Sequence, residues 1–338
     1  MKRALTLAKK GLGRTSPNPV VGAVIVKNGK IIGEGYHKKA GTSHAEVNAI
    51  ASAVESTEGS TIYVTLEPCS TTGKTPPCTD AIITAKFAKV VIATLDPNPN
   101  HAGRGVEILN NAGIETIVGL EKSKCIEINK AFFHWIQTKT PYVILKMAMT
   151  LDGKIATANG NSKWITGPDA RKNVQKLRKW SDAIMVGGGT VRADSPSLNV
   201  RNSQGNPIKN WKQPHRIVAS RTMTPEDAGK LMGPGCQPVI ISPDSPNEWR
   251  KVMKNFGENN ITALLIEGGS ELAASVIKAG IVNEIAFYIA PKILGGKNSI
   301  PVIGGKDPFS LDEALNLQNS KIRKIGDDFL ITGELTKG

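Results

Sequence analysis

The hydrophobic and polar positions of the first 140 residues predict helices and strands in alternation. Apolar runs at 20–26 and 31–36 read as strands, and they flank Asn28-Gly29, a pair typical of a two-residue β-hairpin. Further strands are expected at 61–66, 89–95 and 114–118, and helices at 2–10, 44–54, 78–86, 105–112 and 122–137. A hairpin followed by this alternation predicts a three-layer α/β unit with a mixed sheet.

A second series of elements follows the short polar segment 138–141, which ends in Pro141 and suits a domain boundary. Strands are expected at 142–149, 183–186, 216–220, 238–241, 263–266 and 284–289, and helices at 169–180, 248–256 and 271–279. The polar stretch 202–213 predicts a surface insertion. We therefore expect two domains, residues 1–141 and residues 142–338.

Length and composition fit two globular domains. The chain has 338 residues, of which 40% are apolar and 21% charged, and this excludes a disordered protein. No apolar run approaches the roughly 18 residues of a membrane-spanning helix, and the basic N-terminal segment lacks the apolar stretch of an export signal. Four cysteines exclude a disulfide scaffold and fit a reducing compartment. We expect a cytoplasmic location and no membrane partner.

The formal charge of +14 indicates an anionic partner: a nucleic acid, a phosphorylated substrate or a dinucleotide. The basic residues are scattered and form no Arg-rich tail. We therefore favour small phosphorylated ligands and expect no nucleic acid, although the charge alone also fits an RNA substrate.

One His, one Glu and two Cys stand at the ends of neighbouring predicted elements. His44 and Glu46 open one helix, Cys69 follows a strand, and Cys78 opens the next helix. Two thiolates and one imidazole leave the open position that catalytic zinc requires. The helix N-terminus should lower the pKa of Cys78, and Glu46 is placed to carry protons beside the metal. A closed zinc site or buried free thiols are the alternatives.

This His-x-Glu and Pro-Cys pattern resembles the zinc deaminases, although the two cysteines lie nine positions apart rather than three. The strings 14–24, 44–47, 67–78 and 96–99 resemble the pyrimidine deaminase domain of riboflavin biosynthesis, one member of that group. The resemblance implies that Asn18 contacts the pyrimidine and that Lys74 meets the ribosyl phosphate as a point charge. Turn chemistry is the alternative for Asn18, and a solvated loop cation for Lys74. A His is expected after Ser70, but this chain has Thr71, which puts one substrate contact in doubt.

The second half lacks the usual Gly-x-Gly-x-x-Gly fingerprint but has Gly-rich strand ends at 186–191 and 266–272. Backbone amides there could approach a pyrophosphate, although tight turns use the same residues. The strings 146–154, 164–167 and 189–201 resemble the reductase domain of the same pathway, which looks like dihydrofolate reductase and uses NADPH.

The resemblance implies the following NADPH contacts: Ala148, Trp164, Thr190, Asp194, Ser220, Arg221, Gly269, Ser270, Glu271, Leu272, Ala273, Ala274 and Ser275. It implies substrate contacts at Lys146, Ser162, Arg178, Leu198, Arg201 and Glu267. The two arginines suit bidentate capture of a phosphate, with a solvated helix face or a loop charge as alternatives. Ser220 and Arg221 are candidates for the adenosine 2′-phosphate, or are ordinary loop residues. Lys146 and Glu267 are the candidate proton donors.

Together these patterns predict an α/β chain with an N-terminal cytidine-deaminase-like domain and a C-terminal dihydrofolate-reductase-like domain. The chain is similar to the fused bifunctional deaminase/reductases of riboflavin biosynthesis. The resemblance implies zinc-dependent deamination of a phosphorylated pyrimidine, NADPH-dependent reduction of its ribosyl group, and a homo-oligomer formed through the reductase domains. Two rivals remain: a nucleic-acid or nucleoside deaminase fused to an unrelated domain, and a non-catalytic zinc-stabilised binding protein.

Overall fold

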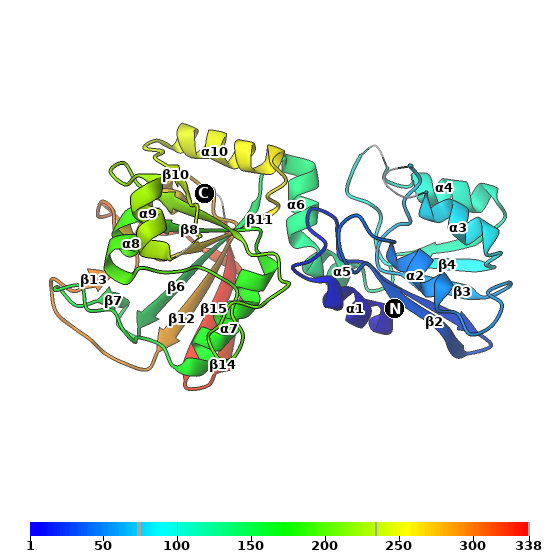
Figure 1. Ribbon diagram of the computed structural model, residues 1–338, viewed down its shortest axis with the longest axis horizontal. Coiled ribbons are helices and arrows are strands. Elements are labelled where there is room, and N and C mark those ends of the chain that lie inside the picture. Colours follow the sequence, from blue (N-terminus) through cyan, green and yellow to red (C-terminus); the bar gives the residue numbers. More distant parts are fainter. Residues whose placement is uncertain (73–75, 100, 234, 337–338) are drawn as a thin grey trace. The chain divides into compact units, whose positions relative to one another are not determined.

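A computed structural model describes residues 1–72, 76–99, 101–233 and 235–336. The chain divides into two compact units, Met1–Lys139 and Thr140–Gly338, each with its own sheet (Figure 1). Within the described ranges, the helices are all too short or too polar to cross a membrane.

The first unit is built on a five-stranded mixed sheet of order β2-β1-β3-β4-β5. The strands are β1 (Gly22–Lys27), β2 (Lys30–Tyr36), β3 (Thr61–Val64), β4 (Lys89–Ile92) and β5 (Glu115–Val118). β1 runs antiparallel to β2 and β3, while β3, β4 and β5 are parallel. The predicted hairpin is confirmed: Asn28 and Gly29 both have positive φ, at 49° and 76°, as the favoured two-residue turn requires.

Helices cover both faces of this sheet and confirm the three layers. They are α1 (Lys2–Ala8), α2 (Ala45–Ala51), α3 (Cys78–Thr84), α4 (Arg104–Asn111), α5 (Lys122–Ile128) and α6 (Lys130–Thr138). Successive residues of a strand point to opposite faces. Accordingly, Ile25 of β1 packs with the core that includes α2, α3 and α4, whereas its neighbour Val24 packs against α1.

The single helix expected at 122–137 is wrong. Two helices, α5 and α6, meet at Asn129, whose φ of −110° and ψ of 15° depart from helical values. The side chain of Asn129 bonds to backbone 109 residues away, so a tertiary contact overrides the apolar pattern that predicted one helix.

The second unit contains an eight-stranded sheet of order β10-β9-β8-β11-β6-β12-β15-β14 (Figure 1). The strands are β6 (Tyr142–Thr150), β8 (Ala183–Gly187), β9 (His215–Ala219), β10 (Val239–Ile241), β11 (Ala263–Glu267), β12 (Glu284–Ala290), β14 (Leu317–Ile325) and β15 (Asp328–Leu335). β15 is antiparallel to both of its neighbours, and the remaining pairs are parallel. A separate pair joins β7 (Lys154–Ala156) to β13 (Ile300–Pro301).

Helices also cover both faces of the second sheet. They are α7 (Pro168–Trp180), α8 (Gly188–Asp194), α9 (Pro225–Met232), α10 (Pro246–Glu258) and α11 (Ser270–Lys278). Leu145 and Met147 of β6 pack in the core with α10 and α11, so Lys146 between them faces the opposite side. On that opposite side, Asn173 of α7 accepts a hydrogen bond from Tyr288 of β12 at 2.8 Å.

Candidate functional site

The predicted zinc ligands lie together in the first unit. His44 immediately precedes α2, Cys69 follows β3, and Cys78 begins α3. The ligand atoms lie within 4.8 Å of one another, and His44 Nδ1 is 3.5 Å from Cys69 Sγ and 3.3 Å from Cys78 Sγ. Ligand atoms of a tetrahedral N/S zinc site are separated by about 3.5 Å, so the donor set and spacing fit zinc.

Within the thiol pair the lower pKa belongs to Cys69, which corrects the expectation for Cys78. Hydrogen bonds from Cys78 and His44 lower the pKa of Cys69 to about 4. The bond to Cys69, together with burial, raises the pKa of Cys78 above its ordinary value. Cys78 stands at the first turn of a short helix, but the adjacent sulfur and the loss of solvent outweigh the helix terminus. A zinc ion supplies the charge that stabilises two adjacent thiolates.

Glu46 lies on the first turn of α2 beside this cluster and is only 3% exposed. Its Oε2 has no hydrogen-bond partner among the described residues. Burial raises the pKa of Glu46 to about 7, so the carboxyl can both take up and release a proton near neutral pH. A buried carboxyl with one oxygen free of partners in the described chain, next to three zinc ligands, suits proton transfer better than ligation.

Asn18 is connected to the zinc region by a contact with the imidazole of His37. The imidazole Nδ1 of His37 lies 3.2 Å from the carbonyl oxygen of Ser43, which can only accept, so this nitrogen carries the hydrogen. The neutral ring then accepts at Nε2 from the amide nitrogen of Asn18, 3.3 Å away. Burial lowers the pKa of His37 and favours this neutral form. The contact fixes which atom of the Asn18 amide faces the ring.

Glu67 lies two residues before the zinc ligand Cys69 and binds backbone groups of a neighbouring segment. Its buried carboxylate accepts hydrogen bonds from the backbone N–H groups of Asp96, Gly103, Gly105 and Val106, at 2.8–3.3 Å. A side chain at Gly105 would come within 2.4 Å of the Pro68 carbonyl oxygen, so only glycine allows this approach. The sequence analysis assigned no role to Glu67, although this residue begins the 67–78 string that resembles the deaminase domain.

Three other predicted features of this unit have different outcomes. Lys74 lies outside the described residues. Thr71 is exposed. Cys125 is buried away from the zinc cluster, as is Cys236 in the second unit.

In the second unit, most of the predicted cofactor and substrate residues line one cavity of about 1710 Å³. They are Lys146, Ala148, Ser162, Trp164, Arg178, Thr190, Asp194, Leu198, Arg201, Glu267, Gly269, Ser270, Glu271 and Leu272. These residues come from β6, from the end of β11, from α7, α8 and α11, and from the loops that carry Ser162, Trp164, Leu198, Arg201 and Gly269. Gly268 and Gly269 have φ of 74° and 92°, values that favour glycine at the start of α11.

A buried charge cluster forms one wall of this cavity. Lys146 of β6 and Glu267 of β11 are direct register partners, and Arg178 reaches them from α7. Arg178 Nε and Nη2 donate to the two oxygens of Glu267 at 2.6 and 2.9 Å. Burial acts to raise the pKa of Glu267, but the charges of Arg178 and Lys146 bring it below its ordinary value. Burial lowers the pKa of Lys146, whose ammonium lies over the ring of Tyr288.

The two arginines differ in what they can still bind. Arg178 does not lie on a solvated face, because its side chain is only 13% exposed. Its guanidinium, which was expected to bind a phosphate, donates two hydrogen bonds to Glu267 instead. Arg201 is partly exposed at the cavity, where Nε donates to Asn199 Oδ1 at 2.6 Å and Nη2 contacts Ser197 Oγ.

Sequence reasoning missed Arg171 and Gln175, which also line the cavity. The Arg171 guanidinium lies 4.5 Å from the centre of the Trp164 ring, and Gln175 accepts from the backbone N–H of Arg201 at 2.8 Å. With Arg178 they have the i, i+4, i+7 spacing of one helix face, a signal that the sequence carried.

Five predicted cofactor residues do not line this cavity: Ser220, Arg221, Ala273, Ala274 and Ser275. Ser220 accepts hydrogen bonds from the backbone of Thr222 and Met223, and Arg221 is exposed. Ser275 accepts from the indole N–H of Trp249 at 2.9 Å.

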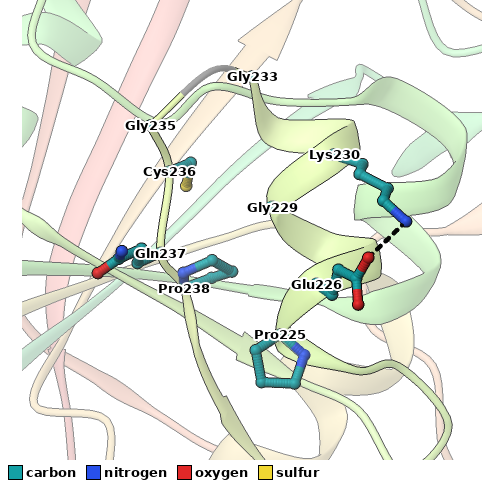
Figure 2. Close-up of a pocket in the computed structure, with 9 residues that line it drawn as sticks. All are labelled: Pro225, Glu226, Gly229, Lys230, Gly233, Gly235, Cys236, Gln237 and Pro238. Atoms are coloured by element: carbon teal, nitrogen blue, oxygen red, sulfur yellow. Dashed lines mark ion pairs between the residues drawn. The ribbon is translucent and has the colours of Figure 1, made fainter.

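A second pocket of about 550 Å³ lies beside α9 and contains none of the predicted site residues (Figure 2). Its polar feature is the ion pair between Lys230 and Glu226, 2.8 Å apart. Both side chains are largely exposed, so the pair contributes little to stability.

The fold and the two sites define a zinc deaminase joined to a reductase. Residues 1–94 match the cytidine and deoxycytidylate deaminase zinc-binding region, and residues 141–331 match the RibD C-terminal domain. The chain is 45% identical to the riboflavin biosynthesis protein RibD of Actinobacillus pleuropneumoniae, covering 98% of this chain and 93% of the relative. It is 41% identical to RibD of Escherichia coli, covering 97% and 96%.

Two solved structures are similar over almost the whole chain. Acinetobacter baumannii RibD has a TM-score of 0.88 and 35% identity, covering 99% of this chain and 98% of that one. The Thermotoga maritima diaminohydroxyphosphoribosylaminopyrimidine deaminase/5-amino-6-(5-phosphoribosylamino)uracil reductase has a TM-score of 0.86 and 36% identity, covering 99% and 97%. The chain belongs to the RibD family of riboflavin biosynthesis proteins. It is a bifunctional deaminase and reductase that uses zinc and NADPH.

Proposed function

We propose that the domain of residues 1–141 removes the 2-amino group of 2,5-diamino-6-(ribosylamino)-4(3H)-pyrimidinone 5′-phosphate by hydrolysis. The domain of residues 142–338 then reduces the ribosyl group of the resulting 5-amino-6-(5-phosphoribosylamino)uracil to ribityl. The observation that carries this proposal is the buried carboxyl of Glu46 beside His44, Cys69 and Cys78, with one oxygen, Oε2, that has no hydrogen-bond partner among the described residues. The names of the similar deaminase/reductases supply the substrates.

In the deaminase domain, His44, Cys69 and Cys78 hold zinc, which when bound supplies the Lewis acidity that activates water. Glu46 takes a proton from the attacking water and delivers it to the departing ammonia, which its near-neutral pKa permits. Asn18 binds polar edges of the pyrimidine, and Lys74 pairs with the ribosyl phosphate. Burial around Glu46 excludes bulk water from the transfer.

In the reductase domain, NADPH when bound would supply the hydride for reduction at C1′ of the opened sugar or its imine. We assign the cofactor to the predicted residues that line the cavity, Ala148, Trp164, Thr190, Asp194 and the segment Gly269–Leu272, and not to Ser220, Arg221 or Ala273–Ser275, which lie outside it. Lys163 and Ser162 contact Asp194 at 3.4 and 3.5 Å and so hold it at the cavity.

The substrate contacts of the reductase domain are Lys146, Ser162, Arg178, Leu198, Arg201 and Glu267. Arg201 takes the phosphate role, because Arg178 is held by the charged Glu267, whereas the side-chain partners of Arg201 are the neutral Asn199 and Ser197. Lys146 is the candidate proton donor, since it is buried at the cavity and burial lowers its pKa. Glu267, the other candidate, has a pKa below its ordinary value and so holds Lys146 in place as a carboxylate rather than donating a proton.

We also propose that the chain acts in the cytoplasm on a small phosphorylated pyrimidine, with neither nucleic acid nor membrane as partner, and forms a homo-oligomer through its reductase domains. The position of β14 at the end of the eight-stranded sheet supports the last point, because an edge strand offers unpaired backbone groups.

The test is NADPH oxidation by the purified protein with and without the diaminopyrimidinone phosphate. We expect oxidation only after this substrate is supplied, with release of ammonia. A nucleic-acid deaminase fused to an unrelated domain would instead leave NADPH unchanged and bind RNA with strong salt dependence.

A further inference from the structure

Asn129, at the junction of α5 and α6, pairs with a loop far away in the sequence. Its side chain is buried, and the residue is 4% exposed. Its Oδ1 accepts from the backbone N–H of Val20 at 2.8 Å, and its Nδ2 donates to the carbonyl oxygen of Val20 at 3.0 Å. The carboxamide thus provides hydrogen-bond partners for both the N–H and the carbonyl group of Val20, as a neighbouring strand would.

Val20 needs these partners because it lies outside the sheet. Strand β1 begins at Gly22, so the ladder of hydrogen bonds does not extend to Val20, which is itself buried. A buried backbone group without a hydrogen-bond partner destabilises the folded chain, because it has lost its bond to water and gained none in return. Removing the Asn129 amide would therefore expose the loop before β1 to two such penalties.

Asn129 is itself held firmly on the helix side. Its backbone N–H donates to Ile126 of α5, and its carbonyl oxygen accepts from Phe133 of α6, both at 3.0 Å. Its Nδ2 also lies 3.4 Å from the Cys125 carbonyl oxygen. The amide is thus a fixed point from which the loop is positioned.

The loop that Asn129 holds leads to the pyrimidine site. Asn18 stands two residues before Val20, and its amide contacts His37. His37 in turn bonds to the carbonyl oxygen of Ser43, the residue before the zinc ligand His44. The backbone N–H of His37 also donates to Val21, the residue after Val20, at 2.9 Å. The loop and the His37 segment are therefore joined on both sides of the Asn129 contact.

We propose that Asn129 is a positioning residue of the deaminase, which holds the 15–20 loop so that Asn18 meets the pyrimidine ring. This inference rests on the proposed contact between Asn18 and the substrate. Asn129 touches neither substrate nor metal, and it acts through the backbone of Val20. The same contact is the reason that α5 and α6 form two helices.

A positioning role and a purely structural role of Asn129 predict different kinetic defects. A displaced loop weakens substrate binding while zinc and Glu46 stay in place. Asn129→Ala should therefore raise the KM for deamination about tenfold, equivalent to about 1.4 kcal/mol, with kcat changed less than about threefold. Zinc content and the reduction of supplied deaminated substrate should equal those of the wild type.

Asn129→Asp is the second variant, because it retains an acceptor for the Val20 N–H but no longer donates to the Val20 carbonyl. We expect a KM increase at least as large, since a carboxylate then faces a carbonyl oxygen. The control is Thr57→Val, which removes a 2.8 Å hydrogen bond to the Ala85 carbonyl at the end of α3 opposite Cys78. It should leave the KM unchanged.

A double-mutant cycle with Asn18→Ala makes the test decisive. If Asn129 acts through Asn18, Asn129→Ala should change the KM less than about twofold in the Asn18→Ala background. Full additivity of the two substitutions would overturn the proposal. An unchanged KM in both Asn129 variants would also overturn the proposal, given that the wild type deaminates the substrate. Loss of zinc together with a fall in kcat would overturn it as well. Deamination by the wild type establishes the proposed function separately, so the two ideas fail independently.

Discussion

Arg178 and Glu267 form a bidentate ion pair in which Nε and Nη2 lie 2.6 and 2.9 Å from the two carboxylate oxygens. The pair joins α7 to β11 and is largely buried, with side-chain exposures of 13% and 10%. Lys146, the register partner of Glu267 on β6, adds a second positive charge. A carboxylate so surrounded stays ionised and gives the cavity a fixed negative group between two cations.

Arg178→Ala should therefore disable the reductase without affecting deamination. Removing one partner of a buried pair leaves an uncompensated charge, and we expect a loss of about 3–5 kcal/mol in the stability of the second domain. Thermal unfolding and NADPH oxidation with supplied deaminated substrate provide the measurements. Lys254→Ala, an exposed cation on α10, serves as the control.

The double substitution Arg178→Met and Glu267→Leu refines this test. Apolar side chains of similar volume often replace a buried ion pair without loss of stability. We expect most of the stability to return and the reductase activity to stay low. A double variant that reduces substrate normally would contradict a role for this pair in the reaction.

The sequence predicted elements whose patterns are local and missed those that depend on distant contacts. The Asn28-Gly29 turn and most strands of the two sheets follow from short-range chemistry, but β14 and β15 were both missed. β14 was not predicted because it is an edge strand with mostly exposed, polar residues and no apolar alternation. The break at Asn129 depends on Val20, which no local signal reveals.

The same division applies to the two sites. His44, Cys69 and Cys78 could be predicted to meet because each stands at the end of an element, and ends of packed elements converge. The ion pair between Arg178 and Glu267 spans 89 positions and depends on how α7 packs against β11. The pKa order of the two thiols depended on their mutual contact, which spacing alone does not give.

Cys78→Ser should deplete zinc and abolish deamination. A neutral hydroxyl replaces one of two thiolates, and zinc then retains only two strong protein ligands. Metal analysis per chain and ammonia release provide the readouts, and Cys125→Ser is the matched control because Cys125 is buried outside the cluster. A Cys78→Ser protein that is fully loaded with zinc and active would contradict the ligand assignment.

Thr71→His should have a small effect, although this position departs from the expected pattern. Thr71 is exposed, and its hydroxyl can donate a hydrogen bond but carries no charge. We expect unchanged zinc content and a deaminase KM within about tenfold of the wild type, and a larger loss for Lys74→Ala. Steady-state titrations of both variants with the deaminase substrate measure these changes in KM and kcat/KM. If Thr71→His improves kcat/KM more than Lys74→Ala reduces it, the loop charge does not compensate for the missing imidazole.

The central claim is that one chain carries two separate active sites, a zinc deaminase governed by Glu46 and an NADPH reductase in the second domain. The most direct test is Glu46→Gln, assayed for zinc, for deamination, and for NADPH oxidation with supplied deaminated substrate. We predict full zinc content, normal reduction, and deamination lowered by at least about 10²-fold, the usual contribution of general acid–base catalysis. Loss of both activities together, or deamination that persists undiminished, would contradict the account.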